Sequence, residues 1–248
     1  MRTLLRVVLG AVVLAAACVL LAPASLLDAP LARRTGERLR LADASGFWWR
    51  GRAVLAARDD PLRIPVAWRV ALAPLVGGAI VVTFDGDVPA MPSGTLAIRD
   101  GALDARDLHA VVPATLVAAL VPTVSGIALR GDVDVRAPSF AWRRDFARGT
   151  IDATWQPATL VAGALPVDLG RVVLNAHPAG EGIAGSVRNG GGALAIDGTV
   201  DVHGGVAAAS IKVTPTASAS TALRALLALT ARADDAGTVT LTWRSDQR

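Results

Sequence analysis

The three histidines are the side chains best suited to bind a metal or move a proton, but they lie far apart in the sequence. His109, His177 and His203 each fall in or beside a run with the alternating pattern of a strand. Metal sites usually draw two of their ligands from positions roughly two to five residues apart. We therefore interpret these histidines as solvated strand residues and expect no metal site. The single cysteine, Cys18, also excludes a disulfide framework and a cysteine-rich metal site.

Motifs for nucleophilic or cofactor chemistry are equally weak. The chain contains no G-x-S-x-G nucleophile elbow. Gly190, Gly192 and Ala195 have the spacing of a dinucleotide-binding loop, but an alternating strand pattern follows where that site requires a helix. The Arg-Gly-Asp tripeptide at 130–132 and the acidic pair at 59–60 fall in predicted turns. The sequence therefore predicts no catalytic residue and no cofactor, and it favours a binding role over an enzyme.

Composition excludes two further classes of protein. Hydrophobic residues make up 52% of the 248 residues and charged residues 19%, so the chain is not intrinsically disordered. The net charge is only +4, and the longest basic runs are the arginine pairs at 33–34 and 143–144. A nucleic-acid-binding protein would need clustered cations in a recognisable module. We expect no nucleic-acid partner.

An apolar segment near the N-terminus is long enough to cross a membrane. Two arginines precede an uncharged run over residues 7–27, and an α-helix needs roughly 20 residues to span the hydrocarbon core. We interpret this run as a retained single-pass membrane anchor, with Val7, Leu14, Leu20 and Leu27 among its apolar side chains.

Two other interpretations of this run remain open. Residues 22–24 form the A-x-A pattern of a signal-peptide cleavage site, and Cys18 follows three alanines as in a lipoprotein signal. All three interpretations export the rest of the chain. With a retained anchor, we expect a cytoplasmic tail over 1–6, a juxtamembrane linker over 28–41 and a periplasmic domain over 42–248. The protein would then belong to the bacterial inner membrane and contact lipid through its anchor.

Beyond the apolar run, hydrophobic and polar residues alternate along the chain. Leu194, Ile196, Val200 and Val202 fall on one face of a strand, and polar residues fall on the other. This period of two is typical of half-buried antiparallel strands. The pattern predicts strands over 46–57, 63–73, 78–87, 94–99, 102–109, 127–137, 140–145, 147–155, 169–177, 182–188, 192–203, 205–214 and 236–244, and helices over 113–121 and 219–233.

The fold class is therefore mainly β: an N-terminal transmembrane helix followed by one extended, mostly antiparallel sheet domain with one or two short helices. The sequence Pro-Ala-Thr-Leu-Val-Ala occurs twice, at 113–118 and at 157–162. This echo indicates either a duplicated sheet unit or chance in a chain rich in alanine, valine and leucine.

Tryptophans are the most distinctive residues of the β region. Trp48 and Trp49 open it, and Trp68, Trp142 and Trp155 lie in later predicted strands. In a core built of small side chains, each tryptophan supplies roughly 150–250 Å² of buried surface. Two interpretations stand: these residues anchor the sheet, or some of them form an aromatic patch that faces a partner or lipid.

Three short motifs in this region resemble those of one family. Residues 44–53 match a run of small-Gly-x-(Val/Leu/Phe)-Trp-x-Gly-x-Ala, residues 65–68 match a Pro-Leu-x-Trp-like strand, and residues 149–155 match Gly-x-x-x-Ala-x-Trp. The chain thus resembles the type II secretion system protein N family, also called general secretion pathway protein N. The doubled Trp48-Trp49 departs from the first motif and leaves its register open.

The resemblance implies an accessory, non-enzymatic part of the machinery that exports folded exoproteins from the periplasm across the outer membrane. The implied partners are other inner-membrane components of that secretion system. The family is similar in turn to the AsmA-like group, whose sheets curve into an apolar trough. That more distant likeness implies an alternative function, an envelope protein that shelters a lipid ligand in the trough.

Overall fold

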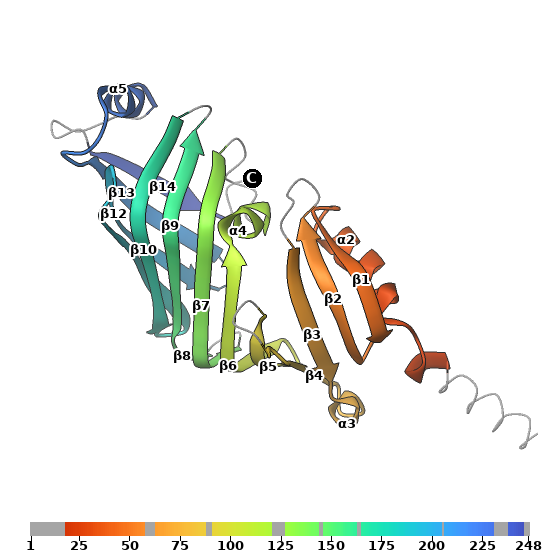
Figure 1. The fold of residues 1–248 in the computed structure, drawn as a ribbon. Helices are drawn as coiled ribbons and strands as arrows, with labels where there is room; N and C mark the ends of the chain where they lie inside the picture. Colours follow the sequence, from red (N-terminus) through yellow and green to blue (C-terminus); the bar gives the residue numbers. More distant parts are fainter. Residues whose placement is uncertain are drawn as a thin grey trace, which may run out of the picture.

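The fold is one large curved sheet with a few short helices (Figure 1). The computed structural model describes residues 18–57, 63–87, 91–120, 127–143, 146–162, 165–204, 206–230 and 238–245. The strands are β1 (Leu39–Phe47), β2 (Arg50–Ala57), β3 (Arg63–Val70), β4 (Ala79–Phe84), β5 (Ser93–Arg99), β6 (Ala102–Pro113), β7 (Ile127–Arg143), β8 (Phe146–Gly149), β9 (Ile151–Ala162), β10 (Leu165–Ala179), β11 (Gly182–Gly190), β12 (Leu194–His203), β13 (Val206–Pro215) and β14 (Val239–Arg244). The helices are η1 (Ala24–Leu27), α2 (Asp28–Arg34), α3 (Leu72–Leu75), α4 (Ala114–Leu120) and α5 (Thr221–Thr230).

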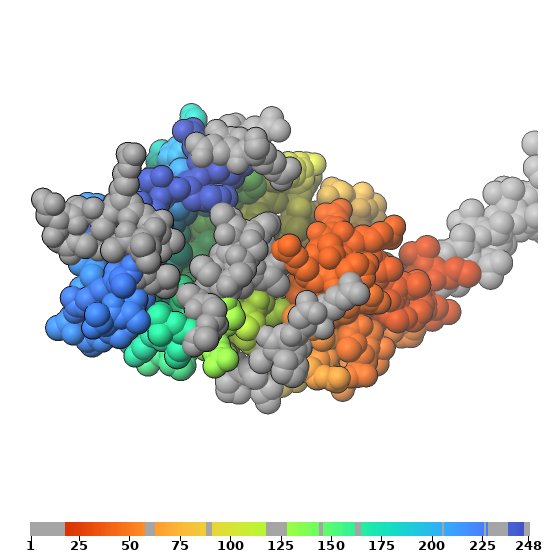
Figure 2. Space-filling view, turned by 90° about the horizontal axis from the view of Figure 1, so that it is seen from above, coloured from red at the N-terminus to blue at the C-terminus, as the bar shows by residue number. Residues whose placement is uncertain are grey.

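The strands follow one another through the sheet in chain order. The long β7 pairs with β8 over one half and with β9 over the other, so β8 and β9 act together as its single neighbour. The sheet curves strongly, and a view from above places the first strands (orange) and the last elements (blue) on opposite sides of the molecule (Figure 2). The structure confirms the predicted mainly antiparallel β architecture.

One face of the sheet is apolar and the other is polar. Side chains that share a register position lie on the same face, because successive residues of a strand alternate between faces. One such row runs through Val135, Ala153, Leu174, Val187, Gly198, Ile211 and Leu241. The neighbouring row on the other face runs through Arg136, Asp152, Asn175, Ser186, Thr199, Ser210 and Thr242. The alternation in the sequence thus becomes two chemically distinct surfaces.

Two helices cover parts of the apolar face. Leu116 of α4 packs with Leu39 of β1 and Ile64 of β3, although α4 itself connects β6 to β7. This contact bridges the two sides of the curve, so the apolar face is the concave one. At the other side, Leu223 of α5 packs into the largest buried cluster, which includes Val213 of β13. The helices thereby fill part of the hollow that the curved sheet would otherwise expose.

Residues 130–132 form a bulge inside β7 and not the turn that the sequence predicts. Two residues of β7, Arg130 and Asp132, are paired with β9, and Gly131 between them is skipped. Gly131 has a φ of +100°, and a Cβ at this position would collide with the carbonyl oxygen of Pro157. Only glycine fits both conditions. The bulge therefore lies within a single strand. This strand, β7, continues to Arg143, beyond the predicted end at residue 137.

The first predicted strand, over 46–57, is two strands. β1 ends at Phe47 and β2 begins at Arg50, so Trp48 and Trp49 form the turn between them. β1 begins at Leu39, inside the segment assigned to the linker, and α2 occupies much of the rest of that segment. Buried Leu39 and half-buried Leu41 explain the difference, because they add an apolar face to a stretch whose arginines had suggested a linker.

The sequence echo is not a structural repeat. Residues 157–162 lie within strand β9, whereas residues 113–118 comprise the end of β6 and the first turn of α4. The same six residues therefore adopt different structures, as expected when packing outweighs local propensity. The duplication hypothesis is wrong for these segments.

The predicted anchor falls mostly outside the described residues. Val7 and Leu14 lie in that undescribed part. Leu20 is exposed in the helical residues 18–20, whereas Leu27, at the end of η1, packs against the cluster around Trp68 on the sheet. Within the described part of the chain, the structure contains no helix with the length and apolar character that a membrane span requires. The division into tail, anchor, linker and domain therefore stays a prediction.

Candidate functional site

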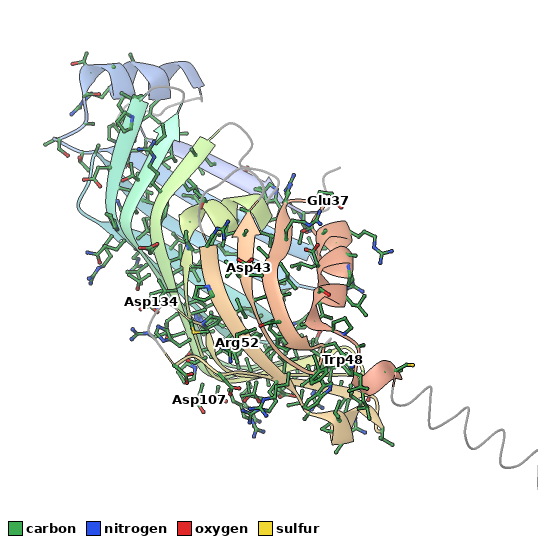
Figure 3. The ribbon with its side chains drawn as sticks, turned by 45° about the vertical axis from the view of Figure 1, so that its right-hand side comes forward. Glu37, Asp43, Trp48, Arg52, Asp107 and Asp134 are labelled. Atoms are coloured by element: carbon green, nitrogen blue, oxygen red, sulfur yellow. The ribbon has the colours of Figure 1, made fainter. Side chains whose placement is uncertain are left out.

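Two indole rings hold the end of the N-terminal apolar segment against the sheet. Trp48 lies at the end of β1, beside the short helical segment at 18–20 (Figure 3). The Nε1–H of Trp48 donates a hydrogen bond of 2.7 Å to the carbonyl oxygen of Val19, and that of Trp49 donates one of 2.9 Å to Leu20. Carbonyls in the last turn of a helix have no partner within the helix. The two tryptophans therefore cap this helix end.

The backbone of the β1–β2 turn contacts the same segment. The N–H of Trp48 donates to the carbonyl oxygen of Ala22 at 3.1 Å, and Pro23 pairs with Phe47 as an isolated antiparallel bridge. The ring of Phe47 stacks on that of Trp49, with ring centroids 5.9 Å apart. Residues 19–27 and 47–49 together form what we call the junction, in which the apolar N-terminal segment is joined to the sheet.

Trp68 of β3 supports the junction from the core. Its side chain is only 7% exposed and packs with Ala24 of η1 and Ala53 of β2. Its Nε1–H donates a hydrogen bond of 2.9 Å to the carbonyl oxygen of Trp48. Trp68 is thus a core residue, whereas Trp48 and Trp49 are half-buried.

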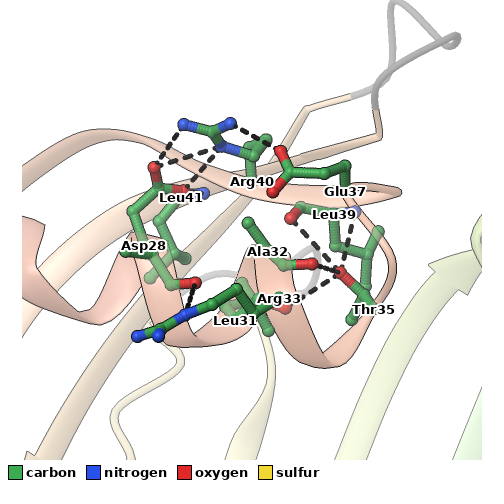
Figure 4. Close-up of polar contacts among 10 residues, drawn as sticks. Asp28, Leu31, Ala32, Arg33, Thr35, Glu37, Leu39, Arg40 and Leu41 are labelled. Carbon is green, nitrogen blue, oxygen red and sulfur yellow. Dashed lines mark hydrogen bonds and ion pairs between the residues drawn. The ribbon is translucent and has the colours of Figure 1, made fainter.

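The carboxylate of Asp28 joins α2 to β1 through hydrogen bonds (Figure 4). Asp28, at the start of α2, accepts hydrogen bonds from Arg40 through Nε at 3.1 Å and through Nη2 at 2.7 Å. The backbone N–H of Leu41 donates to the same carboxylate at 2.8 Å. Arg40 also pairs with Glu37 at 3.0 Å. These charge-assisted bonds hold the helix after η1 in one position on the sheet.

The pKa of Asp28 responds to this arrangement. The hydrogen bonds from Arg40 and from the Leu41 N–H lower the pKa of the Asp28 carboxyl below its ordinary value, and Asp28 in turn raises the pKa of Arg40. Because the folded state lowers this carboxyl pKa, the ionised form stabilises the fold above the ordinary value of about 3.9. That stabilisation is lost as the pH falls through the lowered pKa.

Replacing Asp28 with alanine should loosen α2 without unfolding the sheet. We expect the hydrogen-exchange protection of the Leu41 amide at pH 7 to fall by about tenfold or more, because its charged acceptor is lost. In the unmodified protein, the same protection should decline toward the variant's level as the pH falls below about 4. Exchange measured by mass spectrometry or NMR at several pH values checks both expectations.

Asp197→Ala is the matched control for this test. Asp197 pairs with Arg188 at 3.1 Å, but both side chains are well exposed, so the loss should cost less than about 1 kcal/mol. Leu41 protection should be unchanged in this variant. Equal protection in Asp28→Ala and in the unmodified protein would show that the carboxylate does not hold α2.

The remaining tryptophans lie apart from the junction. Trp155 is half-buried beside the α5 cluster, and its Nε1–H donates to the carbonyl oxygen of Arg130 at 2.9 Å. Trp142 packs near Phe140 at the other end of β7. Trp243 of β14, which the sequence analysis did not select, is 41% exposed. The alternation of Leu241 and Trp243 with threonines was the signal that could have placed Trp243 on the apolar face of the last described strand.

Comparison with known protein families supplies the identity of the fold. Residues 37–242 match the family described as type II secretion system (T2SS), protein N. The match begins in the loop between α2 and β1 and ends within β14, so it covers nearly the whole sheet. The chain belongs to this family. No curated protein and no solved structure matches the chain.

Membership in the protein N family confirms the resemblance drawn from the tryptophan motifs. The family is a component of the type II secretion system, so the role of the chain lies in that system. The motif at 44–53 covers the end of β1, the Trp48–Trp49 turn and the start of β2. This motif therefore includes residues 47–49, which form the sheet side of the junction.

The histidines of this protein N chain do not come together. His109 lies 3.0 Å from a carboxylate oxygen of Asp134, which also accepts a hydrogen bond of 2.8 Å from Arg136. His177 and His203 are exposed in β10 and β12. In the described ranges, no three His, Cys, Asp or Glu side chains are grouped so that they could hold a metal ion.

An open cavity of about 1280 Å³ lies among the turns at one end of the sheet. Trp142 and Phe146 supply aromatic surface, and charged side chains such as Arg99, Asp104 and Glu181 line the rest. These residues come from separate turns that the curvature of the sheet brings together. The described lining therefore mixes aromatic and charged side chains.

Proposed function

We propose that this chain is an accessory inner-membrane component of the type II secretion system that aids export of folded exoproteins by protein–protein interaction. The match of residues 37–242 to the protein N family carries this proposal. The apolar run that begins at residue 7 serves as the single-pass anchor. Its last residues, including Ala24 and Leu27, pack against the sheet beside Trp68 and belong to the junction, which fixes the periplasmic sheet to the anchor. Other inner-membrane components of the secretion system are the partners.

The last strand offers a site where a partner could dock. Among the described strands, β14 pairs only with β13, so residues 239–243 lie at an edge of the described sheet. Leu241 and Trp243 of β14 are both well exposed and lie on the apolar face. A strand added at this edge would extend the sheet and cover these two side chains. This edge supports a mechanism of strand addition.

A clean deletion of the gene tests the proposed function. We expect secreted enzymes to accumulate in the periplasm while a small dye that the outer membrane excludes stays outside. The deletion strain is then complemented with the double variant Leu241→Ser and Trp243→Ser. Both side chains are exposed, so this variant should reach normal levels but restore secretion poorly. The control Ile98→Ser, whose side chain is exposed on the same face but away from β14, should restore it fully.

The outcomes separate the two functions. Normal secretion in the deletion strain would contradict the proposal. Normal secretion together with dye entry would favour the alternative, a protein that shelters lipid on its apolar concave face. The observation behind that alternative is that Ile98, Leu241 and Trp243 remain exposed on this face. Full complementation by the double variant would keep the secretion role and reject the β14 edge as its docking site.

A further inference from the structure

A second apolar element lies beside the junction, in the connection between β3 and β4. Residues 70–84 contain no charged side chain. The middle of this stretch is α3 followed by Val76, whose side chain is 94% exposed. Ala73, Gly77 and Gly78 are exposed as well. A loop that presents an uncharged apolar surface to solvent indicates a site of contact with another apolar body.

This connection is continuous with the junction. In the register of β2 and β3, Arg50 lies opposite Arg69, so the Trp48–Trp49 turn and the β3–β4 connection lie at the same end of the sheet. The N–H of Val70 donates a hydrogen bond of 2.6 Å to the carbonyl oxygen of Trp49. Other exposed apolar side chains of the junction are Val19, Leu20, Leu21, Leu26 and Phe47.

Other turns at this end of the sheet expose charged side chains. The β5–β6 turn at the same end carries Asp100, the end of β7 carries Arg143, and the β10–β11 turn carries Glu181, all exposed. Among the described turns at this end, the β1–β2 turn and the β3–β4 connection expose apolar side chains and carry no charged ones.

We propose that α3 and Val76 insert into the interfacial layer of the same lipid bilayer that holds the anchor. The inference rests on the proposed anchoring of residues 7–27. The N-terminal apolar run, of which residues 7–17 precede the described chain, reaches the sheet at this corner, so a bilayer around that run would lie next to the exposed connection.

The side chains around the connection fit this position. Tryptophan and apolar side chains favour the layer between the lipid tails and the headgroups. Arg50 is exposed on the strand directly behind the Trp48–Trp49 turn, where lipid phosphates would meet it. Arg69 opposite it is also exposed and pairs with Asp85 at 3.1 Å. The domain would thus rest on the membrane at two points, the junction and α3, and have a fixed orientation toward it.

Fluorescent labelling of the full chain in liposomes tests this proposal. A Cys18→Ser background receives a single cysteine at Val76, Glu181 or Leu14, each labelled with an environment-sensitive dye. The vesicles contain phosphatidylethanolamine and phosphatidylglycerol with or without spin-labelled lipid. Val76→Cys and Glu181→Cys both replace exposed turn residues at the same end of the sheet, so they form a matched pair.

We expect the spin-labelled lipid to quench the dye at position 76 nearly as strongly as at position 14, and to leave position 181 unquenched. Iodide in the buffer should quench only position 181. An unquenched dye at position 14 would reject the anchor and with it the proposed topology. Quenching by lipid at 14 but not at 76 would reject only the second contact. A dye at 76 shielded from both quenchers would assign this surface to a protein partner and overturn the proposal.

Discussion

Replacing Trp68 with alanine is expected to lower the free energy of unfolding by about 3–5 kcal/mol. The substitution removes a large, nearly buried ring and leaves a cavity between η1 and β2. It also removes the donor to the carbonyl oxygen of Trp48, which positions the turn that caps the N-terminal helix end. Urea unfolding of the full chain in mild detergent, followed by far-ultraviolet circular dichroism, measures the loss.

Trp243→Ala is the matched control, because it removes the same side chain from an exposed position on the edge strand. We expect it to cost less than about 1 kcal/mol. If the two variants lose equal stability, the β1–β3 core does not depend on Trp68. In the Trp68→Ala variant, faster exchange at residues 22–27 than in β11 or β12 would further show that the junction loosens first.

Gly131→Ala is expected to destabilise the protein by about 2–6 kcal/mol, from two causes that act together. The residue has a φ of +100°, where a side chain is strained, and the added methyl group would collide with the carbonyl oxygen of Pro157. The bulge in β7 and the adjoining part of β9 would have to move apart to accept it. Thermal and urea unfolding of the purified full chain measure the effect.

Gly180→Ala separates the two causes. Gly180 also has a positive φ, of +57°, but a Cβ there would have no atom within 4 Å. This variant should lose about 1–2 kcal/mol, from backbone strain alone. The difference between the two variants therefore reports the close approach of β7 and β9. Equal losses would mean that the sheet relaxes around the methyl group at little cost.

The sequence predicted the strands best where one face is buried and the other solvated. Over 194–203 the alternation of Leu194, Ile196, Val200 and Val202 with polar residues is complete, and the structure places β12 at these positions. Here the pattern and the environment agree residue by residue. Glycine-rich turns such as that before Leu194 further fixed the ends of the strands, because they interrupt the alternation.

The junction could not be predicted, because contacts between distant residues create it. Trp48 and Trp49 bond to carbonyls that lie 29 residues earlier in the chain, and their turn conformation depends on that contact. Tryptophan has a high β propensity, so the sequence alone predicted one continuous strand over 46–57. The pairing of Asp28 with Arg40, twelve residues away, could not be predicted either, because the charged residues between 28 and 41 suggested a linker.

The chain-order pairing of the strands has a consequence for how the protein forms. A chain exported N-terminus first would release β1 and β2 before β13 and β14, and each new strand would find its partner already in place. Contacts between sequence neighbours close short loops, which favours rapid folding. If the chain is exported as proposed, the sheet can assemble strand by strand during translocation, and β14, which carries the proposed docking site, is the last described strand to arrive.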